Sequence, residues 1–545
     1  MIIDRYPKLS AALMVVLSVT LAVSITQLLG LLGLDARAPA YAPIAHPVTA
    51  RVTTYSDATV VDTVLGPLDG GFRTGDLATL ARGSTGLSAS TVFATGAMTA
   101  GDGAGGTFIW APSAPTADDG CTVIVPIDSS GHPSPGAWVR QWSGPIDVRW
   151  CGASSFGSAA ANTVAINNAY KLAVARQSAY LGQSAVLLSG SFRISGTILV
   201  GAPGGGYTSV STIGEGNFAS GLQWDPSDEA LDAGVGDAGT DAGVDGLPVA
   251  QNIAVLYWNN IGATMRNVTI QYVGATPATN SVGLALSGPT ASMDSNQDTF
   301  DTVTVYGFAT DVAVGGVNTA VAGQDCAAQI AFNDTYLEGA TYAGIQGGGD
   351  GNSLEISFKN GGLAGNYIGA ALGTAGGWSF EGGGSSGNTF ATFVFLSEWQ
   401  GPFSLRDWRF EMAAGEIAMS GATQATVDGC TFQMTAAPTG YNVPISLSGY
   451  TAAKITIRNC AFANNFGSDY PEIAAPSNTT GSVSAIEFVN NRLDNPASVP
   501  FFLYPGGASN GMRYSMWGNY LDGGNQGLHI GTIVDGGMVD SVSSP

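Results

Sequence analysis

Histidine is almost absent from this sequence. Only three occur in 545 residues, His46, His132 and His529, and they lie far apart along the chain. Histidine is the usual base beside a serine nucleophile and the commonest metal ligand in proteins. Cysteine is also scarce, and no pair among the five has the short spacing of a zinc site. The sequence therefore argues against histidine-dependent catalysis, and no metal site is predicted.

Charged residues are few, and they are mostly acidic. They make up 11% of the chain, with 19 Lys and Arg against 41 Asp and Glu, and the net charge is −22. An acidic surface repels phosphates, so no nucleic acid partner is expected. Neutral or cationic glycans remain compatible, as do anionic glycans held through a cation. The acidic stretch from Asp225 to Asp245 lacks the spacing of a calcium loop and is expected to be a surface loop. No cofactor is therefore predicted, with Ca²⁺ as the alternative.

Glycine and apolar residues dominate what is present. Gly accounts for 77 residues, and 45% of the chain is hydrophobic. This apolar content is enough to build a core despite the low charge. Short apolar runs separated by Gly, Asn, Ser and Thr predict many short strands joined by tight turns. At this length we expect two or three structural units.

The N-terminus predicts a membrane segment. Arg5 and Lys8 precede an uncharged run of 26 residues, Leu9 to Leu34, long enough to cross a hydrocarbon core of about 30 Å. The basic residues keep the short N-terminus cytoplasmic, so the rest of the chain faces outward. A signal anchor within residues 1–35 is preferred over a signal peptide cut near 38–40. The chain is expected to be extracytoplasmic, either membrane-anchored or secreted.

Shorter segments flank the main part of the chain. Residues 36–75, rich in Ala and Pro, are predicted to form a tether, and residues 76–145 a small β-rich module. Between 162 and 176 the pattern turns helical, with Asn162 as the expected N-cap and apolar residues on one face. Residues 531–545 are expected to form a C-terminal tail.

An internal repeat runs from about Met265 to Leu521. A short apolar strand, a turn and a second short strand recur in ten copies, 22 to 35 residues apart. Nine turns begin at Asn267, Thr302, Asp334, Asn360, Asp407, Gly429, Asn459, Asn490 and Gly518, and a degenerate copy lies around Phe380-Glu381-Gly382. Asn, Asp and Gly suit such turns because they tolerate left-handed backbone angles.

The repeat predicts a coil of strands. One unit cannot bury its own apolar face, whereas units stacked about 4.8 Å apart bury a continuous column and align like residues along the axis. A leucine-rich repeat would show regular Leu spacing, and a propeller blade would need about 40–50 residues. We therefore predict a parallel β-helix over residues 146–530, with the helix at 162–176 covering its open end.

Two stretches resemble the pectate-lyase-like right-handed parallel β-helix superfamily, especially phage tailspikes and bacterial envelope proteins. One is 101–140, with its GDGxGGTFxW, DDGxTVI and GxWVR elements; the other comprises 148–153, the predicted helix and 189–194. The resemblance implies an all-β fold with a right-handed coil, a polysaccharide partner and a homotrimer. Members of the family often carry a Gly-Asp-Gly element and paired aspartates just before the capping helix, whereas residues 154–161 of this chain contain no carboxylate. The catalytic signatures of polygalacturonases and calcium-dependent pectate lyases are also missing. No catalytic residue therefore carries over from the family.

Carboxylates on stacked rungs offer one candidate for catalysis. Glycoside hydrolysis needs two, about 5–5.5 Å or 6.5–9.5 Å apart, and alternate rungs lie about 9–10 Å apart. Glu381, Arg406 and Asp428 fall at matching positions on consecutive rungs, and Asp407 follows Arg406. Glu381, Asp407 and Asp428 are the predicted catalytic residues, with Arg406 binding an acidic sugar; a solvated, charge-balanced ladder is the alternative. Other acids to test are Asp301, Asp334, Glu338, Glu398 and Glu411.

Aromatic residues and cysteines near these rungs give further expectations. Trp378, Trp399 and Trp408 are predicted to bind substrate because indole rings stack on sugar faces. Glu398, which precedes Trp399, is predicted to bind substrate with them. The alternative for the three tryptophans is packing in the core. Cys430 and Cys460 share a rung position within disulfide range. A reduced interior ladder is preferred because parallel stacking sets side chains side by side.

Two functions therefore stay open. One is a spike on a cell or virion surface that recognises polysaccharide, with or without cleaving it by hydrolysis or elimination. The other is a structural or adhesive β-helix without catalysis.

Overall fold

The computed structural model describes the chain between Ala50 and Leu521 with gaps, the longest being 66–90 and 225–253. The chain divides into two compact units after Val48, and every described residue belongs to the second. The predicted membrane segment at 9–34 and the predicted tail at 531–545 lie outside the described residues. Within the described ranges, no helix combines the length and the apolar character needed to cross a bilayer.

An antiparallel sheet comes first, in the order β2-β1-β3-β4-β6-β5. Its strands are β1 (Ala50–Ser56), β2 (Thr59–Leu65), β3 (Thr91–Ala94), β4 (Gly106–Ala111), β5 (Val123–Ile124) and β6 (Ala137–Gln141). β1 and β2 fall inside 36–75, so the prediction of a tether is wrong for this part. Both strands are rich in Val, Thr and Tyr, which favour a pleated surface over an extended linker.

A disulfide links this sheet to the segment that enters the coil. Cys121 lies just before β5, and its partner Cys151 ends the short 3-10 helix η2 (Val148–Cys151). The pairing was not predicted, because nothing in the spacing of the cysteines distinguishes this pair from the others. It closes a loop with a sequence separation of 30 residues. Such a loop restricts the unfolded chain and so stabilises this junction.

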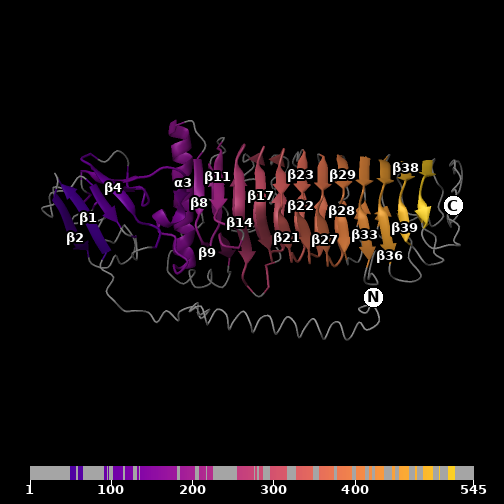
Figure 1. The fold of residues 1–545 in the computed structure, drawn as a ribbon, viewed down its shortest axis with the longest axis horizontal. Helices are drawn as coiled ribbons and strands as arrows, with labels where there is room; N and C mark the ends of the chain where they lie inside the picture. The colour runs from indigo at the N-terminus through magenta and orange to yellow at the C-terminus, as the bar shows by residue number, and fades with distance from the viewer. Residues whose placement is uncertain are drawn as a thin grey trace, which may run out of the picture. The chain divides into compact units, whose positions relative to one another are not determined.

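Helix α3 (Ala159–Tyr180) contains the predicted helix and covers the first rungs (Figure 1). Ala165, Ile166, Ala169, Tyr170 and Ala173 are all buried in the main core. The Tyr170 hydroxyl is 2.8 Å from the Thr212 hydroxyl on the neighbouring strand. The expectation that Asn162 caps the helix is wrong, because the helix starts at Ala159. Asn162 instead accepts a hydrogen bond from the Ser154 N–H and donates one to the Arg193 carbonyl.

The rest of the described chain is a parallel β-helix whose strands stack in two long sheets (Figure 1). The sheet of eleven strands contains β10 (Ile198–Gly201), β13 (Ala254–Asn259), β15 (Val282–Leu286), β18 (Thr310–Val314), β22 (Ala343–Gly347), β25 (Ile368–Leu372), β28 (Ala391–Phe395), β31 (Ile417–Met419), β34 (Ile445–Leu447), β37 (Ile473–Ala474) and β40 (Phe502–Leu503). A two-stranded ribbon pairs β16 (Ser295–Asn296) with β19 (Ala327–Ala328).

The second sheet has twenty-three strands, and most rungs contribute two of them. They are β7 (Ile146–Asp147), β8 (Ser184–Leu188), β9 (Ser191–Ile194), β11 (Val210–Gly214), β12 (Gly221–Trp224), β14 (Thr264–Tyr272), β17 (Thr299–Tyr306), β20 (Ala331–Asn333), β21 (Tyr336–Glu338), β23 (Ile356–Lys359), β24 (Gly362–Ala364), β26 (Trp378–Glu381), β27 (Gly384–Ser386), β29 (Pro402–Arg406), β30 (Arg409–Glu411), β32 (Gln424–Asp428), β33 (Thr431–Met434), β35 (Ala453–Arg458), β36 (Ala461–Asn464), β38 (Val483–Val489), β39 (Arg492–Asp494), β41 (Arg513–Trp517) and β42 (Tyr520–Leu521).

Like residues line up along the coil, as the repeat predicted. Phe300 pairs in register with Phe332, which pairs with Phe358 on the next rung, and the ring centroids are 5.0 and 5.9 Å apart. Cys430 and Cys460 are both buried and free, so the predicted reduced ladder is confirmed. Burial raises the pKa of the Cys430 thiol, which keeps it protonated.

A left-handed corner joins the two strands of a rung. All ten repeated turns place one residue there, with φ between 47° and 68°. Where the corner residue is glycine, a polar side chain of the preceding rung occupies the space that a Cβ would need. Asn360 Oδ1 lies 2.6 Å from the ideal Cβ position at Gly382, and Asp407 contacts the equivalent position at Gly429. These corners therefore need glycine for two reasons, backbone angle and space.

Two aspartates are exceptions in the apolar core. Asp298 and Asp311 are fully buried, and one carboxylate oxygen of each has no hydrogen-bond partner. Burial raises the pKa of Asp298 to about 7, opposed by the hydrogen bond from the Ala263 N–H. Burial also raises the pKa of Asp311 well above its ordinary value. Both groups therefore favour the neutral form in the folded protein.

Adding a methyl group at Gly382 should destabilise the coil by about 1–3 kcal/mol, because the Cβ meets both a strained φ and the Asn360 side chain. Gly339→Ala is the matched control, since Gly339 is also left-handed (φ 73°) but has no atom within 4 Å of its Cβ position. Chemical unfolding of both variants measures the difference. Equal losses would show that the contact with Asn360 contributes nothing.

The contribution of Asp298 to the stability of the fold should fall as the pH rises from about 4 to about 7. Asp298 has a folded pKa of about 7 against an ordinary value of 3.8, so between these values the folded state binds more protons than the unfolded state. Its contribution is full below about pH 4 and lost as the pH passes 7. Asp298→Asn keeps an acceptor for the Ala263 N–H and removes the titration. The stability difference between wild type and this variant should change between pH 4 and 8; a constant difference would contradict the assignment.

Candidate functional site

One outer face of the β-helix carries a regular array of polar side chains. On β29 the burial alternates, with Pro402, Ser404 and Arg406 outward and Phe403 and Leu405 inward. The strands β20, β23, β26, β29, β32 and β35 are stacked in register. Their outward residues therefore form three columns along the axis, which together we call the polar face.

The middle column of the polar face presents hydroxyl groups. We call it the hydroxyl column; it consists of Ser357, Ser379, Ser404, Thr426 and Thr456, each paired with the next. All five side chains are partly exposed. Hydroxyls both donate and accept hydrogen bonds, as sugar hydroxyls do. This column cannot be recognised in the sequence alone, because Ser and Thr carry no strong signal until the register is known.

The next column alternates in charge. This charge column runs Lys359, Glu381, Arg406, Asp428 and Arg458, again in register. The predicted match of positions between Glu381, Arg406 and Asp428 is therefore found in the structure. Glu381 lies 3.9 Å from Lys359 and 4.0 Å from Arg406, and Asp428 lies 2.8 Å from Arg458. These are the contacts of a charge-balanced ladder, and pairs this exposed stabilise the fold little.

The proposed catalytic carboxylates are held by these neighbours. Glu381 lies between two cations, whereas Asp428 Oδ2 accepts a hydrogen bond from Arg458 and Oδ1 accepts one from Asn459. Asp407 is exposed at a left-handed corner, with its side chain lying over Gly429 of the next rung. Glu381 and Asp428 are thus brought onto one face, two rungs apart, while Asp407 occupies a turn position.

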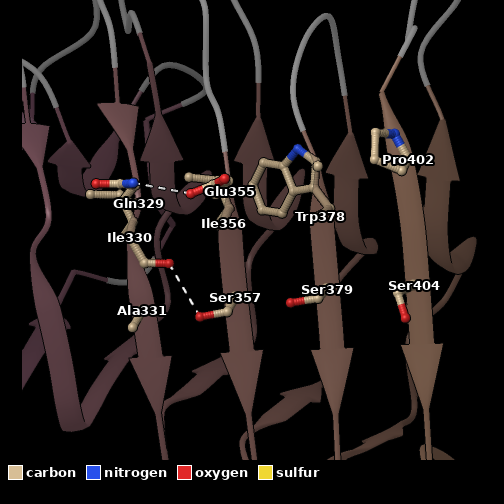
Figure 2. Close-up of a pocket in the computed structure, with 11 residues that line it drawn as sticks. Gln329, Ile330, Ala331, Glu355, Ile356, Ser357, Trp378, Ser379, Pro402 and Ser404 are labelled. Atoms are coloured by element: carbon tan, nitrogen blue, oxygen red, sulfur yellow. Dashed lines mark hydrogen bonds between the residues drawn. The ribbon is translucent and has the colours of Figure 1, made fainter.

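A shallow hollow of about 520 Å³ opens at one end of the polar face (Figure 2). Its lining includes Ser357, Ser379 and Ser404 from the hydroxyl column, with Gln329 and Glu355 beside them. Gln329 Nε2 donates a hydrogen bond of 3.2 Å to Glu355 Oε2, and the Ser357 hydroxyl lies 3.4 Å from the Ile330 carbonyl oxygen. The hollow therefore combines a carboxylate, an amide and a row of hydroxyls.

The substrate-binding role expected of two tryptophans is wrong. Trp378 is 2% exposed and Trp408 is 1% exposed, so neither offers a face to a sugar. Trp378 takes an inward position on β26, and although it is one of the residues that line the hollow, its buried ring leaves no face for a sugar to stack on. Trp408 packs against Phe358 and Phe380 in the core. The core-packing alternative therefore holds for both, and Trp399 and Glu398 lie outside the described residues.

Exposed rings occur instead at a corner on another side of the coil. Tyr342 and Tyr367 directly precede β22 and β25, and are 37% and 44% exposed. Tyr367 stacks on Phe390 of the next rung at 5.3 Å. A search for tyrosine at one repeat position, rather than for tryptophan near carboxylates, would have found this ladder.

The remaining acidic candidates are distributed over several positions. Asp301 extends the charge column toward the N-terminus through its pairing with Asn333. Asp334 occupies a left-handed corner, and Glu338 lies on β21 just beyond it. Glu411 lies on β30, beyond the corresponding corner at Asp407. Glu411 forms an ion pair with Arg409. Across the described part of the chain, His, Cys, Asp and Glu nowhere gather in a group of three or more that could hold a metal ion.

No protein-family model matches this sequence, and no curated protein matches it. Solved structures are similar in fold. Full-length tailspike protein 2 of the Escherichia coli O157:H7 bacteriophage CAB120 is 12% identical over 85% of this chain and 57% of its own, with a TM-score of 0.46. A tailspike of Acinetobacter baumannii bacteriophage Fri1, a capsular polysaccharide depolymerase, is 14% identical over 81% of this chain and 72% of its own, with a TM-score of 0.42.

A third similar structure is the A-module of the mannuronan C-5 epimerase AlgE6 of Azotobacter vinelandii. It is 13% identical, with a TM-score of 0.41, over 70% of this chain and all of that module. The chain spans less than two thirds of the length of several tailspikes that it matches. The similarity concerns the fold alone.

Proposed function

We propose that the polar face binds a polysaccharide lengthwise, as part of a protein that acts outside the cytoplasm. The observation that carries the proposal is the hydroxyl column lying in register beside the charge column. Rungs repeat about every 4.8 Å, which is close to the length of one sugar in an extended glycan. Successive sugars could therefore meet equivalent donors and acceptors on successive rungs.

The charge of this face supports a glycan partner of either neutral or acidic type. With the neighbouring strand β38 included, it carries four cations, Lys359, Arg406, Lys454 and Arg458, and four anions, Glu355, Glu381, Asp428 and Glu487. The whole chain, by contrast, has a net charge of −22. The face is thus locally neutral, and an acidic glycan would not be repelled from it as it would from the average surface.

The disulfide supports the proposal that the protein acts outside the cytoplasm. Disulfides persist in oxidising surroundings and are rare in the cytosol, and Cys121–Cys151 joins two parts of the described chain. A place on a cell or virion surface follows from this proposal, and membrane anchoring through residues 9–34 and trimer formation remain predictions.

A bulky side chain in the hydroxyl column should block binding. Ser404→Trp is expected to weaken binding at least about tenfold, because the ring covers the middle of the polar face. Ala463→Trp is the control, since Ala463 is partly exposed on β36, beyond the corner. Binding of both proteins to a panel of purified bacterial capsular polysaccharides and O-antigens is measured by biolayer interferometry. Equal binding by the two variants would place the glycan on another face.

Cleavage of the glycan is a separate question from binding. Substitution of Glu381 and Asp428, the two carboxylates that lie two rungs apart, tests it. If the polar face hydrolyses or eliminates its glycan, Glu381→Gln and Asp428→Asn should each lower the release of reducing ends by at least about a hundredfold while binding is kept. Asp407→Asn should keep most of the activity, because Asp407 belongs to a corner. Unchanged activity in the first two variants would move the chemistry elsewhere. If the wild-type protein cleaves none of the polysaccharides that it binds, a structural or adhesive β-helix without catalysis is favoured.

A further inference from the structure

Glu355 differs from the other carboxylates of the polar face, because no Lys or Arg of the described residues forms an ion pair with it. Glu381 lies within 4.0 Å of both Lys359 and Arg406. Asp428 lies within the same distance of Arg458, and Glu487 within the same distance of Lys454. Among the described residues the contact of the Glu355 carboxylate is the amide of Gln329. Its neighbour in register on the following rung is Gly377, which has no side chain. The negative charge of Glu355 is therefore left open toward the hollow.

The backbone at this place is held in an unfavourable conformation. Gln297, Gln329 and Glu355 occupy a second left-handed corner on three consecutive rungs, with φ of 56°, 55° and 57°. Left-handed residues other than glycine are mostly Asn and Asp, and those types, with Gly and Thr, fill the ten corners described above. Long side chains at this corner cost free energy that Gly or Asn would not. All three side chains are exposed at the surface of the coil, so burial of apolar area does not offset this cost.

The two features meet in one place, because Gln329 and Glu355 both line the hollow together with Ser357, Ser379 and Ser404 (Figure 2). A carboxylate held by an amide and open on its other side accepts two hydrogen bonds from neighbouring hydroxyls of one sugar. The same charge repels a sugar that carries its own carboxylate.

We propose that this hollow is the subsite that sets sugar specificity. In it, Glu355 accepts hydrogen bonds from the hydroxyls of a neutral or amino sugar, and Gln329 is a positioning residue that orients the carboxylate. The inference rests on the proposed binding of polysaccharide to the polar face. Beyond that proposed function, it specifies which class of sugar binds in the hollow at this end of the polar face.

The deciding variant is Glu355→Gln. It removes the charge and keeps the length of the side chain, and the two preceding rungs already hold Gln at this corner, so the fold should be retained. Glu215→Gln is the matched control, because Glu215 is exposed near the first rungs, away from the polar face. Thermal unfolding of both variants should match the wild type, which separates a binding effect from a folding effect.

Binding is measured with the full chain on the same panel of capsular polysaccharides and O-antigens, sorted into members with and without uronic acids. Glu355→Gln should bind members without uronic acids about tenfold more weakly, and its preference over uronate-containing members should shrink or reverse. Gln329→Ala should cause a smaller loss of the same kind. If Glu355→Gln equals Glu215→Gln on every member that the wild type binds, this inference is overturned while the proposed function stands. If the wild type binds no member, both fall.

Discussion

The hydrogen bonds between consecutive rungs determine almost everything else in this structure. They are parallel and in register, so a residue always lies over its counterpart one rung away, as Phe300 does over Phe332 and Phe410 over Phe432. Inside the coil this register gathers rings into stacks. Outside, it converts a repeated strand position into a column of side chains. A surface with regular chemistry is therefore a direct consequence of how the backbone pairs.

The sequence predicted the stacking of rungs and the matching positions of Glu381, Arg406 and Asp428, because the repeated turns set the spacing between rungs. It did not show which face a side chain takes, nor the columns of residues that no repeated turn marks. The left-handed corners were found because Asn, Asp and Gly mark such positions wherever they occur. Trp378 was misplaced because a strand has two faces, and proximity in the repeat does not say which face a residue takes. Trp408 was misplaced because it follows the corner at Asp407, where the sequence does not show whether a ring points inward. In both cases the large apolar ring is buried in the interior. Glu355 went unnoticed because its corner becomes visible only once Gln297 and Gln329 are aligned with it.

Register also restricts which charges can share a column. Like charges about 4.8 Å apart repel by about 1–4 kcal/mol at the dielectric of a protein surface. The charge column avoids this by alternating sign from Lys359 to Arg458. That alternation is sufficient reason for the ion pairs of Glu381 and Asp428, and a catalytic role is not needed to explain them. Glu355 belongs to another column of the polar face, in which its neighbours Gln329 and Gly377 carry no charge that its carboxylate would balance.

A stacked coil also explains how fold and surface can vary independently. Each rung contacts only its neighbours, so replacing one outward side chain disturbs a pair of contacts and leaves the interior stack as it was. The ion pairs of the polar face are exposed and contribute little to stability, whereas the phenylalanine stacks are buried. Surface chemistry can therefore change while the coil persists. The specificity of this chain must therefore be sought in its columns of outward side chains, and not in the arrangement of its strands.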